Sequence, residues 1–115
     1  MPGALVVDDD SALRLLCRVN LELEGFTVRE ASTVAEAEAA VAAERPDVVL
    51  LDVHLGGDQS HELLARLRGE GIPVALVTGS VDINDYRDVA DAVIAKPFEP
   101  HELVETARRL AKVST

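Results

Sequence analysis

Three consecutive carboxylates, Asp8, Asp9 and Asp10, follow directly after the apolar run at residues 5–7. Like charges this close repel one another, and partial burial at a strand end makes each ionised form costlier still. Such a cluster is stable where a positive charge lies beside it. A hard divalent cation takes carboxylate oxygens as ligands. The cluster therefore predicts a cation site.

Three further polar side chains each follow a later apolar run: Asp52, Thr78 and Lys96. Two or three carboxylates together with waters suit Mg²⁺, which is rarely enclosed by protein ligands alone. A carboxylate held between a cation and an ammonium group can accept a phosphoryl group, because that chemistry depends on positioning and charge neutralisation. A threonine hydroxyl can donate to a phosphoryl oxygen. The residue types thus favour phosphoryl transfer.

The elements that must position these side chains begin with five short apolar runs. The runs are nearly continuous in apolar residues, which is typical of strands covered on both faces. The predicted strands are Ala4–Val7, Thr27–Arg29, Val48–Leu51, Val74–Val77 and Ala92–Ala95.

Segments with helical spacing separate these runs. The spacing predicts helices over Ser11–Glu24, Thr33–Glu44 and Ser60–Arg68, and one that starts at Pro100 and ends near Lys112. The fourth helix in chain order falls within Asn84–Val89 and is short or irregular.

Local signals support the first two helices. Asp10 is the predicted N-cap of the first helix. Thr33 and Glu36 form a capping-box pattern at the start of the second. One stripe of the first helix is predicted to face the core, and it consists of Leu13, Leu16, Cys17 and Asn20.

Five βα units in 115 residues imply a parallel sheet with helices on both faces. In this class ligands bind beyond the C-terminal ends of the strands, where the strand order reverses. The polar residues after the predicted strands therefore lie on one rim, which is the predicted site.

Composition narrows the class of protein. The 115 residues suit one domain, and a formal charge of −10 argues against direct binding to nucleic acid or to a membrane surface. A single cysteine, Cys17, permits no internal disulfide and fits a cytoplasmic location. No signal peptide, membrane span, linker or repeat is recognisable. We expect one domain over residues 1–115, without an output domain.

The residues at the strand ends resemble those of the receiver domain of two-component response regulators, over essentially the whole chain. The resemblance rests on four motifs in register: Val7-Asp8-Asp9, Leu51-Asp52, Val77-Thr78-Gly79 and Ala95-Lys96-Pro97-Phe98. It implies an α/β, flavodoxin-like (βα)5 three-layer sandwich. The implied sheet is parallel and five-stranded, with the order 2-1-3-4-5.

The resemblance also implies roles for individual residues. Asp52 would accept a phosphoryl group from the phosphohistidine of a sensor histidine kinase or a histidine phosphotransfer protein. Asp9, Asp52 and the backbone carbonyl of His54 would bind Mg²⁺ directly, whereas Asp8 would act through water. Thr78 and Lys96 would contact the phosphoryl oxygens. The Lys96–Pro97 bond is expected to be cis.

The implied function is that of a phosphorelay signalling module. Phosphorylation would be followed by conformational switching and slow hydrolysis, so the protein would assist its own modification without being an enzyme in the ordinary sense. An unidentified effector protein and a weak homodimer are the other expected partners.

Several positions depart from the family pattern. The position three residues before the lysine, where the family has a switch aromatic, is occupied by Val93, which has no ring to couple with Thr78. The segment between Thr78 and Lys96 is short, Gly56 stands where proline is usual, and Ser60 stands where glycine is usual.

Four residues outside the four motifs also carry hypotheses: His54, Ser80, Cys17 and Tyr86. We hypothesise that His54 and Ser80 shape water access and so tune hydrolysis of the aspartyl phosphate. Cys17 is interpreted as a core residue, and Tyr86 as an exposed residue rather than a substitute for the switch ring.

Three alternatives stay open. A degenerate receiver that serves only as an interaction scaffold is favoured by Val93. A haloacid-dehalogenase-type phosphatase also uses an aspartate and Mg²⁺, but its motif needs Thr or Val where Ala12 stands. A flavodoxin-like electron carrier needs a phosphate-binding loop after the first strand, and three acids there would repel the flavin phosphate.

Overall fold

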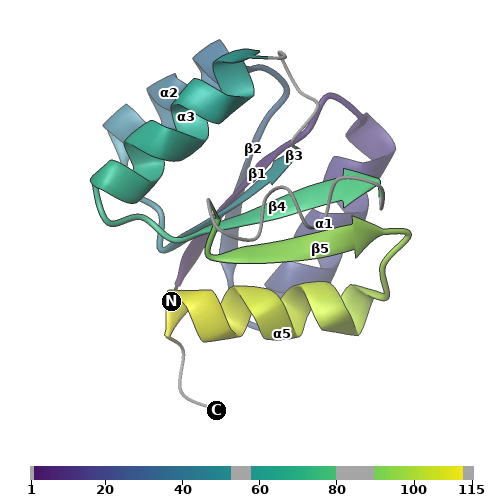
Figure 1. Cartoon of the computed structure of the whole chain (residues 1–115). Helices are drawn as coiled ribbons and strands as arrows, with labels where there is room; N and C mark the ends of the chain where they lie inside the picture. Colours follow the sequence, from purple (N-terminus) through teal and green to yellow (C-terminus); the bar gives the residue numbers. More distant parts are fainter. Residues whose placement is uncertain (1, 53–57, 80–89, 113–115) are drawn as a thin grey trace.

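The computed structural model describes residues 2–52, 58–79 and 90–112. Its strands form one parallel sheet in the order β2-β1-β3-β4-β5 (Figure 1). The strands are β1 (Gly3–Val7), β2 (Thr27–Ala31), β3 (Val48–Asp52), β4 (Val74–Gly79) and β5 (Ala92–Lys96). The predicted sheet and its strand order are confirmed.

Helices cover both faces of this sheet (Figure 1). The described helices are α1 (Ser11–Leu23), α2 (Val34–Ala43), α3 (Asp58–Gly69) and α5 (Pro100–Ala111). Helices α2 and α3 pack on one face, and α1 and α5 pack on the other. The helix predicted within Asn84–Val89 lies outside the described residues.

Alternating side chains of the strands build two hydrophobic cores, one on each face. In β1, Leu5 and Val7 join the cluster beneath α2 and α3, whereas Ala4 and Val6 join the cluster beneath α1 and α5. Every residue of β3 is buried. The near-continuous apolar runs therefore reflect a sheet enclosed on both sides, and the predicted three-layer sandwich is confirmed.

The predicted N-caps of α1 and α2 are both present, and one hydrogen bond at the start of α2 differs from the prediction. The Asp10 carboxylate accepts two main-chain N–H groups of the first turn of α1, which makes Asp10 the N-cap. The Thr33 hydroxyl accepts the N–H of Glu36 at 3.0 Å. The Glu36 carboxylate, however, accepts the N–H of Ser32 at 2.7 Å, so the reciprocal bond of the capping box is shifted by one residue.

The predicted buried stripe of α1 is wrong at one position. Cys17 and Leu21 are buried and Leu13 packs beside them, whereas Leu16 is 40% exposed. Positions 13, 17 and 21 recur every four residues, and Leu16 is rotated from Cys17 by about 100° around the helix. Asn20 is half-buried, and its side-chain amide donates to the carbonyl of Leu16 at 2.8 Å.

The strands continue further than their apolar runs indicated. Asp52 is the last residue of β3, Thr78 and Gly79 end β4, and Lys96 ends β5. Helix α3 begins at Asp58, two residues before its predicted start. Strand pairing depends on main-chain groups and tolerates polar side chains, so Asp52, Thr78 and Lys96 belong to the ladder, whereas Asp8 follows its strand.

Candidate functional site

The C-terminal ends of β1, β3, β4 and β5 place the predicted site residues beside one another. Asp8 directly follows β1, and its N–H donates to the carbonyl of Ala31 at 3.1 Å. Asp52 is paired with Val77, the residue before Thr78 in β4. Gly79, the residue after Thr78, is paired with Lys96. The parallel register therefore brings the polar ends of four strands to one rim, as predicted.

Three carboxylates gather at this rim. Asp8, Asp9 and Asp52 each offer one oxygen, and these three oxygens lie within 4.8 Å of one another. Asp8 and Asp52 are buried, with 3% and 6% of their surfaces exposed, whereas Asp9 is exposed. Carboxylates this close suit a hard divalent cation. The fourth predicted ligand, the backbone carbonyl of His54, lies outside the described residues.

Lys96 supplies a positive charge to the same rim. Its Nζ lies 3.5 Å from Asp8 Oδ2 and 3.9 Å from Asp52 Oδ1. The Lys96–Pro97 bond is cis, as expected. The ammonium group is shared between the two buried carboxylates and offsets part of their repulsion.

The environment of Asp8 disfavours its ionised form. Burial raises the pKa of the Asp8 carboxyl above its usual 3.8, and the charge of Asp52 raises it further. The N–H of Asp10, which donates to Asp8 Oδ1 at 2.9 Å, and the nearby Lys96 act in the opposite direction. The net effect is a raised pKa, so a bound cation would relieve an existing electrostatic strain.

Thr78 brings a buried hydroxyl to the site. The residue is fully buried, and its Oγ1 has no hydrogen-bond partner among residues 2–52, 58–79 and 90–112. A buried polar atom left unpaired costs roughly 1–3 kcal/mol. An acceptor oxygen placed at the rim would satisfy this hydroxyl, which agrees with the role that the resemblance implies for it.

One residue that bonds to the site, Arg14, was not recognised from the sequence. Arg14 of α1 donates through Nη1 to the carbonyl of Asp8 at 2.7 Å and through Nε to Glu30 of β2 at 3.0 Å. The only signal in the sequence is the position of Arg14 four residues after Asp10, in the first turns of the helix. Such a signal does not reveal a bond to the main chain.

The chain matches the model of the response regulator receiver domain over residues 4–108. The chain belongs to this family. The resemblance inferred from the four motifs is confirmed, and so is the flavodoxin-like fold. Receiver domains are the signalling modules of two-component systems, and they bind Mg²⁺ at an acidic pocket. In this chain Asp8, Asp9 and Asp52 form a cluster of carboxylates close enough to hold a metal ion.

Curated relatives are response regulators. The phosphate regulon transcriptional regulatory protein PhoB of Pseudomonas aeruginosa is 37% identical over 108 residues, which cover 87% of this chain and 47% of that protein. The DNA-binding response regulator MtrA of Mycobacterium tuberculosis is 38% identical over 109 residues, which cover 90% of this chain and 48% of that protein. The receiver domain thus spans about half the length of these relatives.

Solved structures of receiver domains superpose closely. The receiver domain of NtrX from Brucella abortus has a TM-score of 0.87 at 30% identity, covering 96% of this chain and 99% of that one. A response regulator receiver protein from Burkholderia phymatum has a TM-score of 0.88 at 27% identity, covering 100% and 98%. The fold of this receiver domain is therefore that of known receiver domains over nearly its whole length.

Five further residues carry predictions made from the sequence: Val93, Cys17, His54, Ser80 and Tyr86. Val93 is half-buried and packs against the core beneath α2 and α3. Cys17 is buried, and burial raises the pKa of its thiol to about 12, which leaves it unreactive as its interpretation as a core residue requires. The hypotheses on His54, Ser80 and Tyr86 concern residues outside those described.

Among the described helices, none combines the length and the apolar character needed to cross a lipid bilayer.

Proposed function

We propose that this receiver domain is a phosphoacceptor module in which Asp52 takes a phosphoryl group from a phosphohistidine. One observation carries the proposal: three carboxylates converge within 4.8 Å, and Lys96 lies beside the two that are buried. A sensor histidine kinase or a histidine phosphotransfer protein would be the donor. We place the module in the cytoplasm, where such donors present their phosphohistidine.

The residues of the rim divide the chemistry among them. Asp8, Asp9, Asp52 and the backbone carbonyl of His54 would hold Mg²⁺, with Asp8 acting through water. When bound, the ion supplies neutralisation of the charge on the transferring group. An oxygen of Asp52 forms the new bond to phosphorus while the bond from phosphorus to the histidine nitrogen breaks. The Lys96 ammonium and the Thr78 hydroxyl contact the phosphoryl oxygens.

Phosphorylation changes the charge of the rim by nearly two units. The buried Thr78 hydroxyl would gain an acceptor, and Lys96 would shift from its two carboxylates toward the phosphoryl group. These movements would start the conformational switch, and slow hydrolysis would end it. In this scheme the domain assists its own modification and dephosphorylation, and it acts as a regulator instead of turning over a separate substrate.

Incubation of the purified domain with acetyl phosphate and Mg²⁺ tests this proposal. We expect the intact mass to increase by one phosphoryl group per chain, and we expect the increase to depend on Mg²⁺ because EDTA removes the neutralising ion. Beryllofluoride should bind only in the presence of Mg²⁺ as well. A domain that stays unmodified under all of these conditions would support the interaction scaffold instead.

The surface of α1 suggests where the phosphodonor protein docks. Four large apolar side chains are exposed in the described part of the chain, and all lie on this helix: Leu15, Leu16, Val19 and Leu23. Positions 15, 19 and 23 recur every four residues, so these side chains form one stripe, which we call the α1 stripe. The helix begins at Ser11, directly after its N-cap Asp10 and next to the three carboxylates of the site. A donor bound to the α1 stripe would therefore have its phosphohistidine within reach of Asp52.

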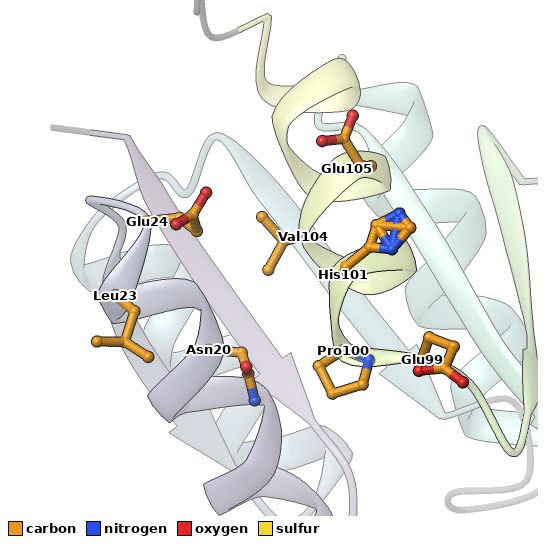
Figure 2. A pocket seen from close by; sticks show the side chains of 8 residues that line it. All are labelled: Asn20, Leu23, Glu24, Glu99, Pro100, His101, Val104 and Glu105. Atoms are coloured by element: carbon orange, nitrogen blue, oxygen red, sulfur yellow. The ribbon is translucent and has the colours of Figure 1, made fainter.

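A pocket continues this surface toward α5 (Figure 2). It has a volume of about 390 Å³, and its lining residues come from the end of α1 and the start of α5: Asn20, Leu23, Glu24, Glu99, Pro100, His101, Val104 and Glu105. Leu23 of α1 and Val104 of α5 contribute apolar side chains to its lining, and Glu105 contributes a carboxylate. The pocket suits the side chains of a protein partner that rests on both helices.

Substitution of Val19 by aspartate tests the docking surface. We expect the rate of phosphotransfer from the histidine kinase that best phosphorylates the wild-type domain to fall about tenfold or more, because a charge replaces an apolar contact. Phosphorylation by acetyl phosphate should not change. Ala39→Asp is the matched control, since it adds the same charge to an exposed position of α2, on the opposite face of the sheet. Equal effects of both variants, or an unchanged rate in Val19→Asp, would place the donor elsewhere.

An interaction scaffold without phosphorylation is the second candidate. The observation that favours it is Val93, which occupies the position of the family's switch aromatic and is a half-buried aliphatic residue packed against the core. The family match argues against the phosphatase and the flavin carrier, because neither belongs to the receiver family. The weak homodimer and the effector protein stay predictions.

A further inference from the structure

Arg14 connects the acidic rim to the edge strand β2. Its guanidinium group donates through Nη1 to the Asp8 carbonyl at 2.7 Å and through Nε to Glu30 Oε1 at 3.0 Å. The Arg14 side chain is only 17% exposed, and the Glu30 side chain is 27% exposed. A planar guanidinium bonded in two directions has a fixed orientation. Arg14 is therefore an ordered part of the molecule and not a solvated surface charge.

With the bond from Arg14, the main-chain and side-chain polar groups of Asp8 all have partners. The N–H of Asp8 donates to Ala31, Oδ1 accepts the N–H of Asp10, and Oδ2 faces Lys96. Asp8 is buried, so its carbonyl also needs a partner. Because β1 ends one residue earlier, Arg14 supplies the donor that the sheet no longer provides.

The same bond fixes the direction of the chain into Asp9. The carbonyl of Asp8 and the N–H of Asp9 belong to one planar peptide unit. By holding the Asp8 carbonyl, Arg14 therefore also fixes the orientation of the peptide plane that leads into Asp9. Asp9 is the exposed member of the three carboxylates, and burial cannot hold it in place as it holds Asp8.

The charge of Arg14 is balanced locally. Glu30 also accepts a bond from Arg18 at 2.9 Å, and Arg18 is paired in turn with Glu22 at 3.2 Å. The bonds from Arg18 and Arg14 lower the pKa of the Glu30 carboxyl, which keeps it ionised. Two cations and two carboxylates thus form a neutral group, so Arg14 can lie beside a cation site without strong repulsion.

We infer that Arg14 is a positioning residue of the Mg²⁺ site, which holds the Asp8–Asp9 peptide so that both carboxylates face Asp52. This inference rests on the proposed metal site and adds a residue that does not touch the ion. Partners that orient metal ligands typically change metal affinity by about 10- to 100-fold when they are removed.

The direction in which Mg²⁺ affinity changes when Arg14 is replaced distinguishes a positioning role from a purely electrostatic one. Removal of a positive charge near a cation site strengthens cation binding if charge alone matters. Loss of positioning weakens it. In Arg14→Gln we expect the dissociation constant for Mg²⁺, measured by calorimetry, to rise about tenfold.

Arg18→Gln is the matched control, because Arg18 donates to the same Glu30 carboxylate but not to the main chain of the site. Its Mg²⁺ affinity should stay within about twofold of wild type. A second measurement needs no metal: the amide of Asp10 should exchange its hydrogen faster in Arg14→Gln, but not in Arg18→Gln, because its acceptor on Asp8 is no longer held in place.

Arg14→Lys covers the case in which Arg14→Gln does not fold. A lysine keeps the charge but not the planar fork, so its Mg²⁺ affinity should also fall severalfold below wild type. Wild-type affinity in either variant, or tighter binding in Arg14→Gln, would overturn the inference while leaving the proposed site intact. A wild-type domain that binds no Mg²⁺ would instead contradict the proposed function itself.

Discussion

Replacement of Asp52 by asparagine is expected to lower phosphoryl incorporation from acetyl phosphate by at least roughly a thousandfold, as removal of a nucleophile does in other covalent mechanisms. The amide has nearly the shape of the carboxylate, so the buried end of β3 should keep its packing. It lacks the negative charge that attacks phosphorus and binds the ion. Intact mass spectrometry of the two proteins under identical conditions measures the difference.

Asp47→Asn is the matched control for this experiment. Asp47 is exposed, precedes β3 and accepts the N–H of Gly3 at 2.7 Å, so it lies at the opposite end of the strand from Asp52. Its substitution should leave incorporation unchanged. If Asp52→Asn were still modified at the wild-type rate, the acceptor would be another residue, and the role proposed for Asp52 would be wrong.

Replacement of Asp8 by asparagine should have two effects of opposite sign. Mg²⁺ affinity should fall roughly 10- to 100-fold, because a carboxylate that supports the ion is lost. The metal-free domain should become more stable, by about 1 kcal/mol, because a buried charge that repels Asp52 and is only partly offset by Lys96 is removed. Calorimetry and urea denaturation in EDTA measure the two quantities.

The raised pKa of Asp8 gives this prediction a pH dependence. The folded domain holds the Asp8 proton more tightly than the unfolded chain does, for which the pKa is near 3.8. The free energy of unfolding contributed by this group therefore falls as the pH rises through the interval above 3.8. The stability difference between Asp8→Asn and wild type should grow over the same interval, and Mg²⁺ affinity of the wild type should weaken as acid protonates Asp8. A stability difference that does not change with pH would show that the buried charge is not the cause.

The sequence predicted the parts of the fold that depend on local patterns. Apolar runs such as Val48–Leu51 identified the enclosed strands, because both faces of the sheet exclude water. The N-cap at Asp10 was predictable for the same reason, because its carboxylate accepts N–H groups from the first turn of its own helix. Convergence of Asp8, Asp9 and Asp52 followed from the parallel topology once the strands were assigned in order.

Features that depend on tertiary contacts were not predictable in this way. Leu16 looks identical to its buried neighbours in the sequence, and only the packing of α1 on the sheet shows that it is exposed. The bond from Arg14 to the Asp8 carbonyl joins a side chain to a main-chain atom, which leaves no pattern of residue types. The ends of the strands were underestimated because main-chain pairing continues through polar residues such as Asp52 and Thr78.

The α1 stripe also has a consequence for the behaviour of the domain at high concentration. Its apolar side chains remain in water whenever no partner is bound, and Leu23 is 76% exposed. Contiguous apolar surface favours self-association. The formal charge of −10 opposes it, because molecules of the same sign repel one another. The acidic composition thus favours a dispersed domain despite its exposed apolar stripe, and colloidal stability should weaken as the pH approaches the isoelectric point near 4.6.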